Sequence, residues 1–358
     1  MILNGDERAV VLLDSLSKFE YVHKFGLFES LPSPSAIFTD YRLIERYFKK
    51  TGNEAYASAL IKVLKDEKLK EELIAGAVSG ADGVITYWSE DYPKELKTVS
   101  KPPLALYYRG NKSLLKSEKK FAIVGSRKTL GEYEAKAESV AKKLSESGVT
   151  IVTGIAEGGD KAAIDGAIGS GRIISVFAGG VDIIYPKRHE DLINKIAKSG
   201  LIISEMPCGA PSIYYMFIMR NRIIAALGNG TLIVGGGETS GTRHTAEFAL
   251  EYGKEVCCFP YGFGEAGRIC KTLIKNGAAM VESAEEIAEL MGYKLNEERE
   301  KDLSDEERAI LKIIEEGTEK TDEIIEKSPL PLQKTIETLA MLEIKRIVKK
   351  NLDAYGII

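Results

Sequence analysis

From Phe121 onward, short apolar segments alternate regularly with amphipathic stretches. The apolar segments FAIV, TIVT, IISVFA, LIISE, TLIVG and EVCCF each end in a glycine-rich turn, and stretches with helical periodicity follow several of them. Continuous apolar strands between amphipathic helices are typical of a parallel sheet that helices cover on both faces. The pattern predicts an α/β domain over residues 79–292, built on an extended Rossmann-like, doubly wound, mostly parallel sheet. The ligand of such a sheet lies at the carboxyl ends of its strands.

The segments on either side of this domain have a different sequence pattern, without the alternation of apolar strands and helices. Residues 1–78 show helical periodicity interrupted by breaks such as LPSPS, which predicts a helical N-terminal domain, sterile-alpha-motif-like or helix-hairpin-helix-like. Residues 293–302 form a charged linker. Residues 303–358 open with a capping pair, Ser304 and Glu307, and continue through three short helical stretches to a possible hairpin. That order predicts a winged-helix-like C-terminal domain.

Composition restricts the classes of partner and site. The chain has 358 residues and a net charge of −4, so a nucleic-acid site must be a local basic patch. The four cysteines lack metal-ligand spacing, and two of them are adjacent in the apolar run EVCCFP, which indicates reduced thiols. No apolar run is long enough to span a membrane, and MILNGDER is not a signal peptide. We expect a cytoplasmic protein with no membrane segment, metal site or cofactor.

The segment FAIVGSRK carries the first candidate site. Four apolar residues form a strand, and Gly125, Ser126, Arg127 and Lys128 turn from it toward a helix. Backbone N–H groups and the dipole of the following helix favour an anion at such a turn, and an arginine fork suits a phosphate. The turn lacks both the dinucleotide-binding and the Walker lysine spacing. The sequence therefore predicts a phosphate site, with a plain strand–helix turn as the alternative.

Glycine-rich or basic turns follow the other predicted strands. TGIAEGGD opens a helix, AGGVDIIYPK ends a strand with two glycines, and GGGETSGT precedes a helix. Small residues there let a ligand approach the main chain. RNR stands at the start of the predicted helix RNRIIAAL, where two arginines oppose the helix dipole unless an anion pairs with them. The predicted contacts are Gly154, Gly158, Gly179, Gly180, Tyr185, Lys187, Arg220, Asn221, Arg222, Ser240, Gly241 and Thr242.

Each of these turns also has a structural interpretation. Asp160 can cap the helix that it opens, and Lys187 with Arg188 can form a solvated surface pair. The RNR arginines can pair with Glu205 or with Asp160, and GGGETSGT can be a plain loop. Together the motifs favour a binding site more strongly than any one of them does alone, because turns at corresponding strand ends line one crevice.

Taken in order, these motifs resemble the DNA-processing protein A family, also called Smf or DprA. The resemblance covers essentially the whole chain. It rests on ITYWSEDYPKELKTVSKPPLALYYRGN, then IVGSR, TGIAEGGD, FAGGVDIIYP, ISEMPCGAP, RNRIIAAL, SGTRHTAEFAL and KTLIKNGA. It implies a protein without enzymatic activity that binds single-stranded DNA, helps to load the RecA recombinase on it during natural transformation, and dimerises through its Rossmann domain. Arg127 and Lys187 match family positions that contact DNA.

The chain departs from the family pattern at several positions. Glu157 stands where the family often has a basic residue, and Ile164 where it has a histidine. The strand before the SG loop ends in Gly235, Gly236 and Gly237 in place of an acidic segment, and IYYMFIM replaces a segment with Phe-Pro. These departures leave the phosphate turn intact but leave the ligand of the pocket open.

Several further questions stay open from the sequence alone. The alternative function is a nucleotide-binding sensor or a nucleotide phosphoribohydrolase similar to the LOG family, whose signature is partly echoed by Gly236-Gly237, Gly241-Thr242 and Glu247. Of the three histidines, His244, which is close to the SG loop, is the one with a plausible chemical role; the alternative is a surface residue at the start of a helix. The C-terminal domain can bind either DNA or protein.

Several aromatic side chains lie near the motifs, where they can stack on bases or pack in the core: Tyr185, Tyr214, Tyr215 and Phe217.

Overall fold

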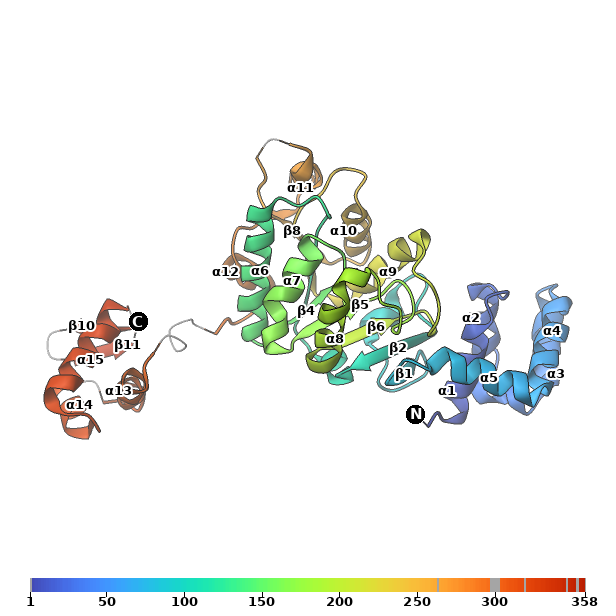
Figure 1. Cartoon of the computed structure of the whole chain (residues 1–358), viewed down its shortest axis with the longest axis horizontal. Coiled ribbons are helices and arrows are strands. Elements are labelled where there is room, and N and C mark those ends of the chain that lie inside the picture. The colour runs from blue at the N-terminus through green and yellow to red at the C-terminus, as the bar shows by residue number, and fades with distance from the viewer. Residues whose placement is uncertain are drawn as a thin grey trace. The chain divides into compact units, whose positions relative to one another are not determined.

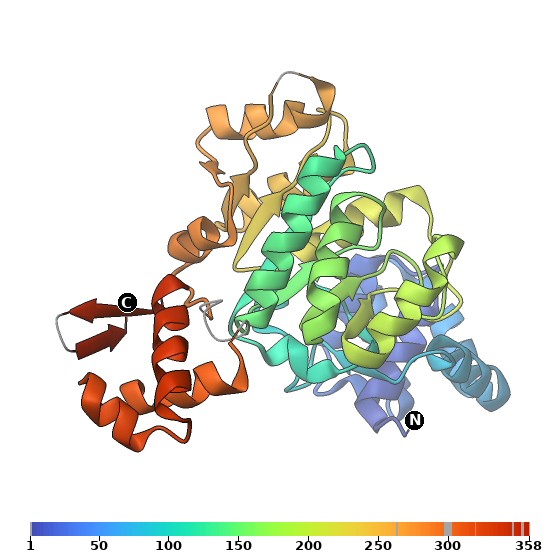
Figure 2. The same cartoon turned by 60° about the vertical axis from the view of Figure 1, so that its left-hand side comes forward.

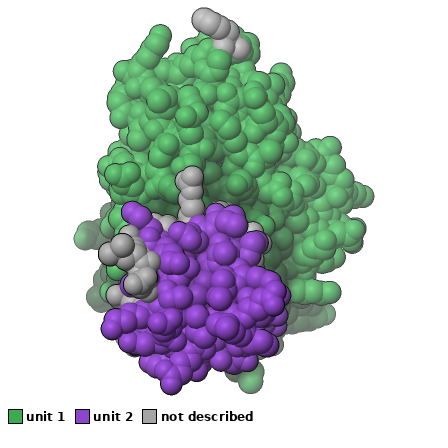
Figure 3. Space-filling view, turned by 90° about the vertical axis from the view of Figure 1, so that its left-hand side faces the viewer, with its two compact units in different colours: residues 1–295 green, residues 296–358 purple. Residues whose placement is uncertain are grey.

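The computed structural model describes residues 2–262, 264–296, 303–318, 320–345, 347–351 and 354–357. The chain forms two compact units, residues 1–295 and residues 296–358, which Figure 3 colours separately. No helix among the described residues is long and apolar enough to cross a membrane.

Within the described part of the first unit, nine strands form one sheet in the order β1-β2-β6-β5-β4-β3-β7-β8-β9 (Figure 1). The strands are β1 Gly83–Thr86, β2 Ala105–Gly110, β3 Lys120–Val124, β4 Thr150–Thr153, β5 Ile173–Val176, β6 Leu201–Ser204, β7 Gly230–Ile233, β8 Glu255–Cys258 and β9 Ala279–Met280. The strands from β6 to β9 in this order are parallel, and β1 and β2 add an antiparallel pair next to β6. The predicted doubly wound, mostly parallel sheet is confirmed.

The central strands are mostly apolar on both of their faces, and the sheet is accordingly buried on both sides. In β3, Phe121 and Ile123 face one hydrophobic core, whereas Ala122 and Val124 face the other. In the described part of the first unit, the helices that follow the strands are α6 Gly131–Glu146, α7 Gly159–Ala167, α8 Glu190–Ser199, α9 Tyr214–Leu227, α10 Gly241–Glu251, α11 Arg268–Lys275 and α12 Ala284–Met291. Buried residues of α6, α7, α8 and α12 belong to the first core, and those of α9, α10 and α11 to the second. Figures 1 and 2 both show α6 and α7 side by side on the same face of the sheet.

The order in which the chain adds strands to the sheet reverses at the boundary between the parallel strands β3 and β7. From β3 the chain continues through β4, β5 and β6 on one side, whereas β7, β8 and β9 extend the sheet on the other side. Turns at the carboxyl ends of neighbouring strands diverge at such a boundary and leave a crevice between them. The predicted phosphate turn after β3 therefore lies at the switch point.

Five helices precede the sheet: α1 Gly5–Ser15, α2 Tyr21–Glu29, α3 Tyr41–Lys50, α4 Glu54–Lys65 and α5 Glu67–Val78. α1 packs against β1 and β2, and the hydroxyl of Tyr107 in β2 donates to Asp14 Oδ2 at 3.0 Å. Trp88, which follows β1, makes ring contacts with Phe25 and Phe28 of α2. The separate N-terminal domain over residues 1–78 stays a prediction.

The second unit contains α13 Asp305–Glu315, α14 Thr321–Lys327, α15 Leu332–Ile344, β10 Val348–Asn351 and β11 Ala354–Ile357. The two strands form an antiparallel hairpin. Ser304 and Glu307 form the predicted capping box at the start of α13. The three helices and the hairpin appear in the predicted order, and the assignment as a winged helix stays a prediction. The predicted linker, residues 293–302, lies largely outside the described residues.

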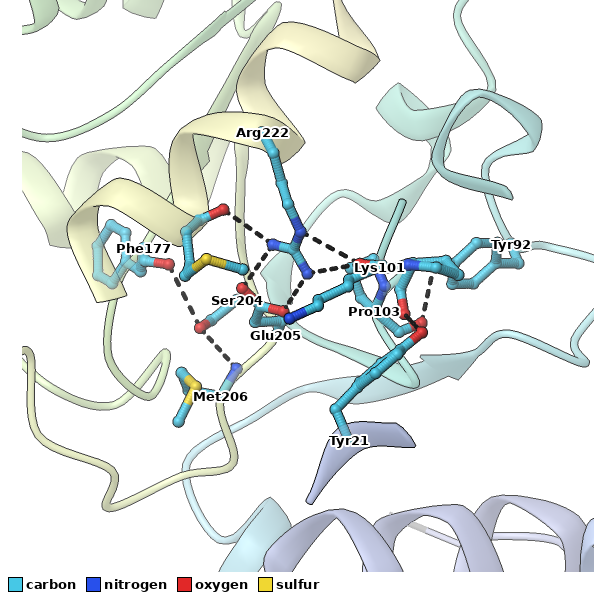
Figure 4. Close-up of polar contacts among 11 residues, drawn as sticks. Tyr21, Tyr92, Lys101, Pro103, Phe177, Ser204, Glu205, Met206 and Arg222 are labelled. Atoms are coloured by element: carbon cyan, nitrogen blue, oxygen red, sulfur yellow. Dashed lines mark hydrogen bonds and ion pairs between the residues drawn. The ribbon is translucent and has the colours of Figure 1, made fainter. Parts of the chain in front are cut away.

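A buried ion pair joins α9 to the sheet and to the segment before β2 (Figure 4). Both terminal nitrogens of the Arg222 guanidinium donate to Glu205, at 2.7 and 2.6 Å, and its Nε and Nη2 also donate to the backbone oxygen of Lys101 at 3.1 and 2.8 Å. On the adjacent residues, Tyr21 donates to the backbone oxygen of Pro102 at 2.8 Å. This cluster therefore connects α2, the end of β6 and α9.

Breaking this pair is expected to destabilise the first unit strongly. Arg222→Ala leaves the carboxylate of Glu205 without its partner in a buried position, which costs about 3–5 kcal/mol. The exposed pair of Arg243 and Glu247 provides the matched control, and Arg243→Ala should cost less than about 1 kcal/mol. Urea unfolding followed by the fluorescence of Trp88, the one tryptophan of the chain, measures both. Equal effects of the two substitutions would contradict this account of the cluster.

Candidate functional site

A pocket of about 340 Å³ opens at the carboxyl ends of β3, β4 and β5. Its walls come from the turn after β3, the turn after β4, the segment that follows β5 and the first turns of α9. The lining residues are Arg127, Ile155, Ala156, Glu157, Tyr185, Pro186, Lys187, Arg188 and Phe217. Three of the predicted contacts, Arg127, Tyr185 and Lys187, are thus brought together.

The pocket carries three exposed cations. Arg127, Lys187 and Arg188 are all solvent-exposed. Among the described residues, neither Arg127 nor Lys187 takes part in a salt bridge, whereas Arg188 pairs with Glu157. Arg127 and Lys187 thus line the pocket without a carboxylate partner among the described residues, whereas Arg188 is paired with Glu157, which is also a lining residue. Such an arrangement attracts a phosphate-bearing ligand.

Glu157 lies between Arg188 and the buried side chain of His189. Its Oε1 is 2.7 Å from Nε2 of His189, and Nδ1 of the same ring is 3.0 Å from the backbone oxygen of Ile155. A carbonyl oxygen only accepts, so Nδ1 donates, and the second contact requires one proton between Nε2 and the carboxylate. Burial raises the pKa of Glu157, but His189 and Arg188 outweigh it and bring the pKa below its usual value. Glu157 is therefore an anion fixed in the wall of a basic pocket.

His189 and Glu157 were not among the predicted contacts. The sequence singled out His244 instead, which lies on α10 beside Glu247 with Nδ1 3.3 Å from Oε2 and does not line the pocket. The sequence feature that could have identified His189 as a residue of the site is its position directly after Tyr-Pro-Lys-Arg. For Glu157 it was the occurrence of an acid in a turn at a strand end.

The backbone N–H groups predicted to hold the anion are already used within the protein. The N–H groups of Gly125 and Ala156 donate to the two oxygens of Asp160, at 3.2 and 3.3 Å. The N–H of Ser126 donates to the backbone oxygen of Gly235 at 3.1 Å. The predicted backbone cradle is therefore corrected: Asp160 occupies the anion position of the turn, and the cations of the side chains remain for a ligand. Asp160 makes no cap hydrogen bond to its own helix.

The glycines of these turns are required by contacts between chain segments. A methyl group added to Gly125 would lie 2.5 Å from Cα of Gly159, and one added to Gly158, whose φ is +84°, would lie 2.2 Å from the backbone oxygen of Ser126. Close packing of the β3 turn on the start of α7 thus explains both residues. The same holds for Gly154, Gly179 and Gly180, where an added methyl group would lie within 2.6 Å of neighbouring polar side-chain atoms. Approach of a ligand is not needed to account for any of them.

The RNR segment differs from its prediction in position and in role. α9 begins at Tyr214, so Arg220, Asn221 and Arg222 lie in its middle and the predicted conflict with the helix dipole is wrong. Arg222 makes the buried pair with Glu205 that the sequence allowed as an alternative, and we no longer assign it to a ligand. The amide of Asn221 donates to the backbone oxygen of Gly241 at 3.1 Å and so ties α9 to the SG loop.

Arg220 is buried behind the pocket, with its guanidinium carbon 5.9 Å from the ring centre of Phe217. Its Nη1 donates to the backbone oxygen of Val176 at 3.0 Å, and its Nε has no hydrogen-bond partner in the described part of the chain. Burial lowers the pKa of Arg220, and the charge of Asp160 opposes that shift. Burial raises the pKa of Asp160, and Arg220 opposes that shift in turn. The two side chains thus compensate each other inside the protein, and we remove Arg220 from the direct contacts.

The SG loop lies at the end of β7 and does not contribute to the lining of this pocket. The hydroxyls of Ser240 and Thr242 contact each other, and Thr242 also donates to the backbone oxygen of Gly235 at 3.4 Å. The described ranges contain no group of three His, Cys, Asp or Glu side chains placed to hold a metal ion. For Ser240, Gly241, Thr242 and Lys128, a role in ligand binding stays a prediction.

The chain is similar to proteins of one family. The model of the family described as DNA recombination-mediator protein A matches residues 83–292. The DNA processing protein DprA of Bacillus subtilis (strain 168) is 37% identical over 204 residues, which cover 56% of this chain and 68% of that protein.

Two solved structures are also similar. DNA processing protein A from Streptococcus pneumoniae has a TM-score of 0.68 at 24% identity and covers 83% of this chain and 100% of its own, which is a likeness of fold. DNA processing protein A from Helicobacter pylori has a TM-score of 0.55 at 29% identity, covers 59% of this chain and 97% of its own, and is described for its single-stranded DNA binding mode.

The packing of Gly125 on Gly159 yields a direct test of how the site is built. Gly125→Ala places a methyl group 2.5 Å from Cα of Gly159, and overpacking of this kind costs about 1–3 kcal/mol. Gly131→Ala is the control, because a methyl group there meets nothing within 4 Å at the first residue of α6. We expect a lower urea midpoint for Gly125→Ala and an unchanged or slightly higher midpoint for Gly131→Ala. A neutral Gly125→Ala would show that the two turns are not in contact.

Proposed function

The chain belongs to the DNA recombination-mediator protein A family, and on that premise we propose that it binds single-stranded DNA and helps to load a RecA recombinase on it during natural transformation. DNA processing is the general function that family membership supports. The observation that carries the proposal is the pocket in which Arg127, Lys187 and Arg188 converge at the strand ends. Cations on side chains suit the repeating phosphates of a strand, because they adapt to several phosphates without reading bases.

Aromatic side chains beside the cations support a single strand as the ligand. Tyr214 and Tyr215 begin α9 and are 81% and 55% exposed, which is unusual for large rings unless a partner covers them. Tyr185 and Phe217 line the pocket with their ring centres 5.5 Å apart. Unpaired bases stack on such rings, whereas the bases of a duplex are already stacked on each other. The combination therefore favours a single strand over a duplex.

The alternative of a nucleotide sensor or phosphoribohydrolase receives less support. Asp160 places a carboxylate at the strand end where a single nucleotide phosphate would otherwise meet backbone N–H groups. Glu247, which echoes the hydrolase signature, lies exposed on α10 and pairs with Arg243. A polymer that engages the outer cations fits these observations better than a mononucleotide.

The partners and the location of the protein are further parts of this proposal. We propose a homodimer formed through the Rossmann domain, in which two pockets follow one strand, and a cytoplasmic location where DNA and RecA are both present. For the C-terminal unit we favour a protein partner over DNA. The exposed side of α15 carries Leu332, Ile336 and Ile344 beside Glu337, a surface poorly suited to phosphates.

The cations of the pocket are expected to control affinity and its salt dependence. Arg127→Ala and Lys187→Ala should each weaken binding of a fluorescent oligo-dT. Each lost phosphate contact should also reduce the slope of log K against log salt by about 0.7. Lys198→Ala, in the last turn of α8 and away from the pocket, should change neither quantity. Fluorescence anisotropy over a salt series, with and without competing duplex, measures both. Unchanged affinity and slope for the Arg127→Ala, Lys187→Ala double variant would contradict the assignment.

The exposed tyrosines should contribute through stacking, which does not depend on salt. Tyr214→Ala and Tyr215→Ala should each cost up to about 1–3 kcal/mol of binding free energy and leave the salt slope unchanged. Tyr214→Phe and Tyr215→Phe keep the ring and should retain the affinity. The same anisotropy titrations test this, and loss of affinity in the Phe variants would point to the hydroxyl in place of the ring.

A further inference from the structure

Glu157 is out of place in a pocket that otherwise presents cations. It is one of the lining residues, together with Arg127, Lys187 and Arg188. A carboxylate there repels the phosphates of a strand, so its presence needs a physical account. Its contacts supply one, because the carboxylate is held from two sides by groups that a phosphate would also attract.

The first of these groups is the guanidinium of Arg188, whose Nε pairs with Oε1 of Glu157. The side chain of Arg188 is 65% exposed, so the guanidinium lies at the surface of the pocket and can exchange one anion for another without unfolding the turn. A carboxylate and a phosphate oxygen are equivalent acceptors for an arginine fork. In the free protein Arg188 is therefore occupied by an anion that belongs to the protein itself.

The second group is His189, which fixes the position of the carboxylate. Its ring is buried, is anchored by Nδ1 to the backbone oxygen of Ile155 at 3.0 Å, and places Nε2 2.7 Å from Oε1 of Glu157. Glu157 is thus held at the wall when Arg188 leaves it. Lys161, on α7, adds a further positive charge near Glu157, although it pairs with Asp165.

We propose that Glu157 is an intramolecular competitor of the DNA phosphates: it holds Arg188 in the free protein, and a phosphate of the bound strand takes Arg188 over. The inference rests on the proposed function. It gives Glu157 a defined effect, because each binding event must first break the pair of Glu157 and Arg188. The carboxylate therefore weakens binding and speeds release, which suits a protein that hands its strand on to another protein.

The test is the replacement Glu157→Gln in the full chain, with labelled oligo-dT as the probe. Glutamine keeps the size and an acceptor oxygen for His189 but removes the charge that holds Arg188. We expect several-fold tighter binding and slower dissociation in stopped-flow competition, because the pair of Glu157 and Arg188 no longer has to be broken. The salt slope should stay close to that of the wild-type protein, since Arg188 contacts one phosphate in both complexes.

Two controls separate this mechanism from a general change of charge. Glu190→Gln makes the same charge change at the exposed residue next to His189, outside the pocket lining, and should leave the affinity and the dissociation rate nearly unchanged. In an Arg188→Ala background, Glu157→Gln should no longer tighten binding several-fold, since the guanidinium that it releases is gone. If Glu157→Gln fails to fold, Glu157→Asp keeps the charge but shortens the reach to Arg188, and it should tighten binding in part.

The outcomes distinguish this inference from the proposed function. If the wild-type protein binds oligo-dT but Glu157→Gln has the same effect as Glu190→Gln, or keeps its effect without Arg188, the competitor role is overturned and single-strand binding stands. If the wild-type protein does not bind oligo-dT at low salt, both are overturned.

Discussion

The carboxylate of Asp160 holds together the turns on which the pocket is built. It accepts from the N–H groups of Gly125 and Ala156 and so joins the turn after β3 to the turn after β4. Across Gly154 it faces Arg220, since a methyl group on that glycine would lie 1.9 Å from Nη1 of Arg220 and 2.3 Å from Oδ2 of Asp160. The strand ends and α9 thus meet at two buried, opposite charges. A pair of this kind tolerates the loss of neither partner, because the remaining charge is left buried.

This internal anion determines what kind of ligand the crevice can take. In many doubly wound folds a nucleotide phosphate meets the backbone N–H groups at the strand ends. Here those groups donate to Asp160 and to the carbonyl of Gly235, so we assign phosphate binding to the exposed side chains of Arg127, Lys187 and Arg188. Flexible side chains at the surface fix no single phosphate, but they can follow a chain of phosphates. In the function proposed above, the exposed rings at the start of α9 add stacking contacts, and Glu157 is proposed to limit how tightly the strand binds.

The sequence predicted the architecture well, and the reasons are physical. Strands that are buried on both faces are apolar throughout, and their helices are amphipathic, so the order of elements and the sheet class followed from periodicity. The position of the pocket followed from the rule that turns at strand ends meet. The start of α9 was missed because IYYMFIM is apolar without a capping residue, so nothing marked Tyr214 as its first residue. For Arg220 and Arg222 the sequence left a ligand and an internal carboxylate as alternatives, because Asp160 and Glu205 are distant in the chain and only the fold decides between the two. The same limit applied to Glu157 and His189, which become neighbours only when the turns after β4 and β5 meet.

The central claim is that a single strand of DNA lies in the pocket at the ends of β3, β4 and β5. The most direct measurement is photo-crosslinking of an oligonucleotide that carries 4-thiothymidine, followed by mass spectrometry of the crosslinked peptides of the full chain. We predict crosslinks in the peptides that contain Tyr185 and Tyr214 to Phe217, and their loss when unlabelled oligo-dT is in excess. Crosslinks confined to residues 303–358, or to the face formed by α1 to α5, would contradict the claim.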